Sequence, residues 1–296
     1  MSDQTTWRAG LRGALLLTCS AIAFGAMVLL AKLSCVRLPP AEVAAFRFGI
    51  GLAVVGALWA GRLVRVRPER AQVPLLLLRG VSGGLAVLLL FVAIGRGHVG
   101  VATLLNFTSP VFTAVFAWIF LRERLSAWAV AALVVAGAGV SLVWRGSTEG
   151  GHASLLGWQS LGLASAALAG VAVTTIRALR RYRAAGTWTV FAFFCACGLA
   201  CTAPVAVNGF LSPTPVEWLL LLAMGLTAVI GQVLMTYALA SVPAALSGII
   251  QQLTVVIALL MGHLALSEPL SLTSAVGTAL TIAGVIWAAW LSREEA

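Results

Sequence analysis

Residues 97–144 decide the fold, because the chain contains their pattern twice. They read GHVGVATLLNFTSPVFTAVFAWIFLRERLSAWAVAALVVAGAGVSLVW. Here an apolar run is interrupted by residues with polar side chains or a helix-breaking ring: Asn106, Thr108, Ser109 and Pro110. A charged turn around Glu123 follows, and then a second, alanine-rich apolar run. Residues 242–290 repeat this plan, with Gln251 and Gln252 in the first run and Glu268 in the turn.

The two copies are related by a constant offset in the sequence. Aligning Glu123 with Glu268 gives 268 − 123 = 145 residues. The same offset pairs identical residues far outside the opening stretch: Ser20 with Ser165, Gly25 with Gly170, Phe46 with Phe191, Gly80 with Gly225 and Val140 with Val285. Matches at one constant offset, without gaps, over this length of sequence predict an internal duplication. We therefore divide the chain into the repeats 1–147 and 148–296, which together form one membrane domain.

The composition is that of a membrane protein. Hydrophobic residues make up 61% of the chain and charged residues 9%, and the mean hydropathy is +1.03. Since a helix needs about 20 apolar residues to cross a bilayer, we expect an all-α integral membrane fold with ten transmembrane helices, five in each repeat. The expected spans are 11–33, 42–60, 72–95, 99–121, 127–145, 157–178, 188–207, 216–239, 243–265 and 271–291. The first run lacks a small-residue cleavage site, so we interpret it as a span and not as a signal peptide.

The positive charge indicates orientation in a membrane. The formal net charge is +10, but the arginines are expected in short loops, as the positive-inside rule requires, and not on one face as in a nucleic-acid binder. The loops near 62–70 and 122–124 carry six arginines, and their counterparts near 208–215 and 266–270 carry none. Five is an odd number, so we expect the second repeat to be inverted in the membrane. Both termini are placed in the cytoplasm.

Several motifs resemble those of a known family. Each repeat ends with a charged turn followed by a glycine-containing last helix. The two turns read LRERLSAW at 121–128 and LSEPLSLT at 266–273. A further motif, AAFRFGIG at 44–51, places Arg47 within an apolar run. With these motifs and two five-helix repeats, the chain resembles the EamA type of the drug/metabolite transporter superfamily. In size and plan it is similar to the YddG-like exporters of aromatic and other amino acids. One departure is Ala192, the offset partner of Arg47, so the role of Arg47 is not duplicated.

The resemblance implies a multi-pass exporter in a bacterial inner membrane. Its partners would be a small-molecule substrate and the lipid bilayer, with no nucleic acid. Inverted repeats in secondary transporters place the substrate near the midplane between the halves, and the halves move by alternating access. Ten helices suffice to enclose a pathway, so we expect the chain to function as a monomer.

The first candidate for a substrate site is the polar group around Asn106. Pro110 has no N–H for the carbonyl of Asn106, which predicts a kink that could take part in gating. The Asn106 amide, Thr108 and Ser109 would lie there beside an unpaired carbonyl and could bind substrate. The alternative is that a neighbouring helix satisfies these groups, since polar contacts between helices are common in membrane bundles.

The second candidate lies in the other repeat, where Gln251 and Gln252 are adjacent mid-span amides. Gln251 is the offset partner of Asn106, so we expect the two side chains to approach each other near the pseudo-twofold axis. Gln232 and Tyr237 are further substrate-binding candidates, or bond to backbone. Uncharged amides and hydroxyls fit a polar or zwitterionic solute.

Three charged residues are expected to be structural. Arg47 is expected to snorkel to the membrane surface or to pair with a helix end, although it could instead attract a substrate carboxylate. Glu123 and Glu268 lie in turns between two helices. We expect each to cap the helix that follows it or to pair with an arginine.

The nine acidic residues all map to termini, loops or helix ends. Proton-coupled carriers usually place a carboxylate or histidine within the bilayer, so we expect uncoupled facilitated diffusion of amino acids. The alternative is an exporter of cationic drugs. This alternative is weaker, because a binding site for a cation would need a buried acidic side chain. A channel is a further alternative, and its transport rate would not saturate with substrate concentration.

No cofactor, metal site or catalytic group is expected. The five cysteines lie in or beside apolar runs without a neighbouring histidine or carboxylate, which disfavours a metal site. The three histidines are scattered near span ends and loops, so an intramembrane enzyme is not favoured.

Overall fold

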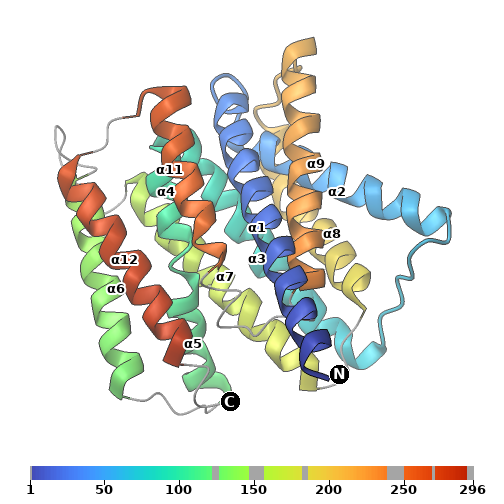
Figure 1. The fold of residues 1–296 in the computed structure, drawn as a ribbon. Coiled ribbons are helices and arrows are strands. Elements are labelled where there is room, and N and C mark those ends of the chain that lie inside the picture. The colour runs from blue at the N-terminus through green and yellow to red at the C-terminus, as the bar shows by residue number, and fades with distance from the viewer. Residues whose placement is uncertain are drawn as a thin grey trace.

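The computed structural model describes residues 2–121, 127–146, 157–181, 186–238, 250–268 and 271–291, and the regular elements in these ranges are all helical (Figure 1). The first half contains α1 (Ser2–Ser34), α2 (Pro40–Ala60), the short 3-10 helix η1 (Arg70–Gln72), α3 (Val73–Arg96), α4 (Val99–Asn106), α5 (Ser109–Leu121) and α6 (Ala127–Gly146). The second half contains α7 (Trp158–Arg181), α8 (Thr187–Val207), α9 (Pro215–Ala238), α11 (Leu253–Leu266) and α12 (Leu272–Leu291).

The helices follow the apolar runs of the sequence. Most expected spans agree with a helix to within a few residues, although α1 begins earlier and the span 99–121 consists of two helices, α4 and α5. Of the expected span 243–265, residues 243–249 lie outside the described residues, and the rest includes most of α11. Five helical segments among the described residues are long and apolar enough to cross a bilayer: Arg12–Ser34, Pro40–Ala60, Arg70–Arg96, Thr187–Val207 and Pro215–Met235. The chain is therefore a multi-pass membrane protein.

Both halves have a helix break at the same position of the repeat. In the first half, α4 ends at Asn106 and α5 begins at Ser109, so the helix is interrupted at the place where the missing N–H of Pro110 predicts a kink. In the second half, Gln252 is a turn residue between helical residues 250–251 and the start of α11. Since 107 + 145 = 252, this break falls on the offset partner of Phe107. It was not predicted, because no proline accompanies it.

The two halves also pack through equivalent contacts. α1 packs against α9, and their offset partners α7 and α3 pack against each other. In the first pair, Ser20 Oγ donates to the Gly231 carbonyl at 2.7 Å; in the second, Ser165 Oγ donates to the Ala86 carbonyl at 2.6 Å. Donors and acceptors are both 145 positions apart, so one interhelical hydrogen bond occurs twice.

α1 and α7 run in opposite directions (Figure 1). Lys32, in the last turn of α1, donates from Nζ to the carbonyls of Ile94 at 2.9 Å and Gly97 at 2.7 Å, at the end of α3. The ring of Trp158, the first residue of α7, lies against Gly97. Thus α1 and α3 end where α7 begins. We call this end of the bundle, opposite the start of α1, the distal end.

The largest apolar cluster of the described residues lies toward the distal end. It combines the last turns of α1 and α3 with the first turns of α2 and α4 and with parts of α9 and α11. Its fully buried members include Ala31, Val43, Phe91, Ile94, Val99, Leu221, Met224 and Ala258. The described helices are therefore closely packed against one another toward the distal end.

Candidate functional site

Asn106 takes part in a chain of hydrogen bonds that crosses three helices. Its Nδ2 donates to Ser165 Oγ on α7 at 2.7 Å, and Ser165 Oγ donates to the Ala86 carbonyl on α3 at 2.6 Å. The side chain of Asn106 is half-buried. The amide is thus bonded to a neighbouring helix, which was the alternative given for the polar groups at the kink. A role in substrate binding stays a prediction.

Two threonine hydroxyls near this break donate to the local backbone. Thr108 is buried, and its Oγ1 donates to the Leu105 carbonyl at 2.6 Å. The Ser109 carbonyl accepts a hydrogen bond of 2.9 Å from Thr113 Oγ1. Hydroxyl-to-backbone bonds of this kind satisfy the groups left over where a helix stops. They leave Asn106 as the side chain that links this break to another helix.

The break in the second half lies close to the first. Val255, three residues after Gln252, shares an apolar cluster with Leu105, which precedes Asn106. Gln252 is buried and Gln251 is half-buried. Nearby, the hydroxyl of Thr254 is buried without a hydrogen-bond partner among the described residues. α4 and α11, which carry or adjoin these residues, therefore pack together, and joint binding of a substrate by the two groups stays a prediction.

Gln232 and Tyr237 differ in their surroundings. Gln232 is half-buried on α9 and directly follows Gly231, the acceptor of the Ser20 hydrogen bond. Tyr237 lies near the end of α9 with 53% of its surface exposed. Gln232 therefore lies beside the central polar groups, whereas the side chain of Tyr237 is on the outside of the bundle.

Arg47 is buried within the bundle, and its expected structural role stays a prediction. Only 6% of the residue is exposed, and its Cζ lies 5.0 Å from the ring centroid of Phe48 and 5.4 Å from that of Phe194. The side chain leaves α2 on the face that packs against α8. The guanidinium is therefore buried in the bundle beside two phenylalanine rings.

Arg79 is a second buried arginine, which sequence reasoning missed. It lies on α3, within the apolar run 72–95, with 9% of its surface exposed. Its Cζ is 4.6 Å from the centroid of the same Phe194 ring. The rule that arginines occupy loops therefore fails twice in the first half. A charged residue flanked by leucines and glycines in VPLLLLRGVSGG was the signal that could have found it.

Glu268 caps a helix, but not the one that was expected. Its carboxylate accepts the backbone N–H of Val99, the first residue of α4, at 2.8 and 2.9 Å. A carboxylate at a helix N-terminus is favourable because it meets free N–H groups and the positive end of the helix dipole. The following helix, α12, is instead capped by Ser271 Oγ, which accepts from the Ser274 N–H at 3.1 Å. Glu123 lies outside the described residues.

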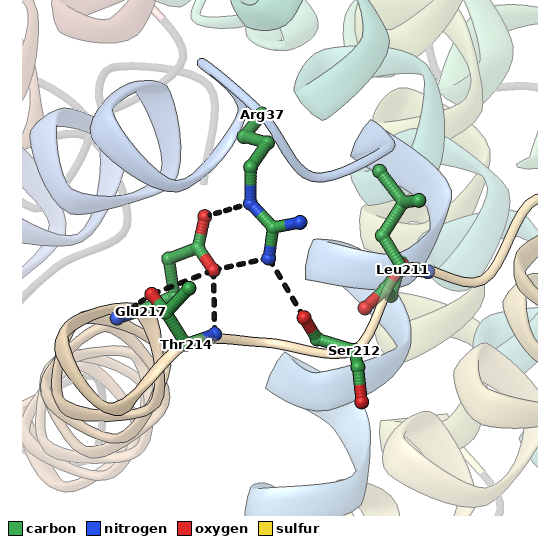
Figure 2. A network of polar contacts seen from close by, with 6 residues as sticks. Arg37, Leu211, Ser212, Thr214 and Glu217 are labelled. Atoms are coloured by element: carbon green, nitrogen blue, oxygen red, sulfur yellow. Dashed lines mark hydrogen bonds and ion pairs between the residues drawn. The ribbon is translucent and has the colours of Figure 1, made fainter.

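A polar network joins two loops at the distal end (Figure 2). Arg37 Nε donates to Glu217 Oε1 at 2.6 Å, and its terminal nitrogen donates to Glu217 Oε2 at 2.5 Å and to the Ser212 carbonyl at 2.7 Å. Glu217 also accepts the N–H of Thr214 at 2.7 Å. The hydrogen bond to Glu217 raises the pKa of Arg37 above its ordinary value. The network ties the α1–α2 loop to the α8–α9 loop.

The acidic side chains that the structure describes avoid the middle of the bundle. They are Glu42, Glu69, Glu217 and Glu268. Glu42, in the first turn of α2, is buried; Oε2 accepts the Leu211 N–H at 3.0 Å and Oε1 has no described partner. No three histidine, cysteine or acidic side chains within the described ranges are grouped to hold a metal ion.

Comparison with protein families gives a match to both halves. A family described as the EamA-like transporter family matches residues 11–145 and again residues 156–290. The two matched segments correspond to the repeats seen in the sequence and in the packing. Members of this family are transporters and not enzymes.

Individual relatives cover most of the chain. The pseudopaline exporter of Pseudomonas aeruginosa is 31% identical over 273 residues, which are 92% of this chain and 94% of that protein. A probable terminal-alkyne amino-acid exporter of Streptantibioticus cattleyicolor is 32% identical over 241 residues, 78% of this chain and 77% of that protein. One solved crystal structure of a protein is similar in fold, with a TM-score of 0.66 and 25% identity, and covers 95% of this chain and 98% of its own.

Proposed function

Because the chain belongs to the EamA-like transporter family, we propose that it exports amino acids or amino-acid-derived metabolites across the inner membrane of a bacterial cell. The observation that carries the proposal is the pair of helix breaks at Phe107 and Gln252. Discontinuous helices at the interface of two repeats supply free backbone groups and polar side chains to a solute. The names of the two relatives, one of them a probable terminal-alkyne amino-acid exporter, support the substrate class.

The proposed topology has ten spans as two inverted five-helix repeats, with both termini in the cytoplasm. The opposite directions of α1 and α7 support the inversion (Figure 1). The arginines between α2 and α3 support the orientation: Arg62, Arg65, Arg67 and Arg70. By the positive-inside rule this loop faces the cytoplasm, so the distal end faces the periplasm.

Transport would proceed by alternating access. In the described conformation three sets of contacts join helices at the distal end: the apolar cluster, the Glu268 cap on α4 and the Arg37–Glu217 network. Opening toward the periplasm requires these contacts to separate while the halves close below the substrate. The helix breaks give each repeat a place where its backbone can adjust during that motion.

Export would be facilitated diffusion down the substrate gradient. A proton-coupled carrier needs a titrating group that alternates between the two sides. Among the described residues, the acidic side chains lie at helix ends or in loops, and Glu42 and Glu268 are both engaged by backbone N–H groups. The cationic-drug alternative is disfavoured, because the charges buried beside the centre of the bundle are arginines.

Uptake of radiolabelled amino acids into proteoliposomes tests the proposal, with and without an imposed pH gradient. We expect saturable uptake of neutral amino acids that is indifferent to the gradient. Uptake that requires the gradient would contradict facilitated diffusion. Uptake that does not saturate would indicate a channel, and no uptake of any amino acid would contradict the substrate class.

A further inference from the structure

Two arginine side chains converge on one aromatic ring inside the bundle. The Cζ atoms of Arg47 and Arg79 lie 5.4 and 4.6 Å from the ring centroid of Phe194. They come from α2 and α3, and the ring belongs to α8. We infer that these two residues, the arginine pair, bind a carboxylate of the exported solute; the inference rests on the proposed function and identifies the group by which the solute is recognised.

Neither guanidinium is compensated within the described part of the chain. Both Nε atoms are buried without a hydrogen-bond acceptor, and the ion pair formed among the described residues is that of Arg37 with Glu217. The two positive charges also repel each other. Burying a charge without a partner is strongly unfavourable. Such an arrangement persists where a ligand supplies the missing charge.

The backbone around the pair leaves room for the guanidinium groups. A Cβ atom added to Gly83, one turn after Arg79 on α3, would overlap a terminal nitrogen of Arg79 and lie 2.9 Å from the Phe194 ring. Glycine at this position therefore lets the guanidinium lie directly on the helix. On α2, a Cβ added to Gly51 would lie 2.7 Å from Cys195 Sγ. Both contacts bring α2, α3 and α8 close together around the charges.

The arginine pair lies next to the central polar groups. Phe48 and Phe194 belong to an apolar cluster against which Val87 and Val233 pack. Val87 follows Ala86, the acceptor of the Ser165 hydrogen bond, and Val233 follows Gln232. A solute held at the pair by its carboxylate would thus place its other groups beside the amides and hydroxyls of the predicted site.

A carboxylate is the anion that this geometry fits best. Guanidinium groups bind carboxylates through two parallel N–H···O bonds. The Phe194 ring attracts both cations by cation–π interaction and so keeps the two guanidinium groups close to each other. An ammonium group alone would meet two like charges, so decarboxylated analogues should be rejected.

Thermal unfolding of the purified full-length protein in neutral detergent tests the inference. The probes are L-phenylalanine, 3-phenylpropionate and phenethylamine, which share a ring and differ in the carboxylate, together with a pool of the proteinogenic amino acids. We expect the carboxylates to raise the Tm and phenethylamine to leave it unchanged. In Arg47→Gln and Arg79→Gln we expect the apparent Kd for the carboxylates to rise about tenfold to hundredfold.

The ligand-free protein provides a second readout that does not depend on the choice of solute. Since each arginine is buried without a partner, the Tm of Arg47→Gln and Arg79→Gln should equal or exceed that of the wild type. Arg79→Lys should keep part of the carboxylate response. Arg65→Gln, which changes an exposed loop arginine, is the matched control and should keep all of it.

Three results would overturn the inference. The first is a clear fall in the ligand-free Tm of both glutamine variants, which would show that the arginines are structural. The second is a carboxylate response that is absent, or equal in wild type and variants. The third is an arginine-dependent response to phosphatidylglycerol but not to the carboxylates, which would assign the pair to a lipid phosphate. Arginine-dependent binding without transport in proteoliposomes would instead contradict the proposed function alone.

Discussion

Arg37 and the arginine pair are the same kind of side chain in opposite situations. Arg37 has 44% of its side chain exposed, yet it donates three hydrogen bonds and has a carboxylate partner. Arg47 and Arg79 are 6% and 9% exposed and have no described acceptor. A protein selected for stability alone would pair the buried charges first, because water already solvates the exposed one. The reversed order is what we expect if the buried pair binds a ligand, as we propose.

The largest effect that follows from this comparison concerns Gly83. In Gly83→Ala the new Cβ would occupy the position of the Arg79 terminal nitrogen, so the guanidinium must move. We expect the kcat/KM for amino-acid transport to fall about tenfold or more, a loss of about 1.4 kcal/mol in transition-state stabilisation. The measurement is initial uptake rate in proteoliposomes against substrate concentration.

Gly49→Ala is the matched control for this prediction. Gly49 lies on α2, close in sequence to Arg47, and nothing lies within 4 Å of a Cβ added there. Its transport kinetics should match those of the wild type. Equal kinetics in Gly83→Ala and the wild type would break the comparison, because the position of Arg79 would then be irrelevant to the solute.

The sequence alone predicted the helices well but not the buried charges. The spans followed from hydropathy, and the break near Asn106 followed from Pro110 because a missing N–H acts locally. The break at Gln252 has no proline, so local chemistry could not reveal it. Arg79 was hidden because a window average of an apolar run hardly registers one charge. The cap by Glu268 was predicted in kind, but its partner Val99 is 169 residues away in sequence, which only the fold brings close.

An intermediate effect is expected from the duplicated hydrogen bond. Ser20 and Ser165 are both fully buried and each donates to a carbonyl of a partner helix. Ser165 additionally accepts from Asn106. We expect Ser20→Ala to destabilise the protein by about 1 kcal/mol and Ser165→Ala by about 2 kcal/mol, because the latter also leaves the Asn106 amide unpaired.

Thermal unfolding of the two serine variants measures this difference. In the Asn106→Ala background the extra cost of Ser165→Ala should disappear, while that of Ser20→Ala should persist. Equal costs in all backgrounds would show that the amide of Asn106 does not depend on Ser165. Asn106 would then be free to turn toward a solute, which would support its assignment to the predicted substrate site.

The smallest effect is expected at Arg37, despite its many hydrogen bonds. Exposed ion pairs contribute little because water and salt screen them, so the Tm of Arg37→Gln should differ from the wild type no more than that of Arg65→Gln does.

The hydrogen bond to Glu217 raises the pKa of Arg37. A raised pKa means that the contribution of this group is fully present below its unfolded-state pKa and is lost only above it. The wild-type Tm should therefore show no loss attributable to Arg37 between about pH 7 and pH 10. A large fall in the Tm of Arg37→Gln would show that the exposed network holds the distal end closed, and exposure would no longer separate structural arginines from the arginine pair.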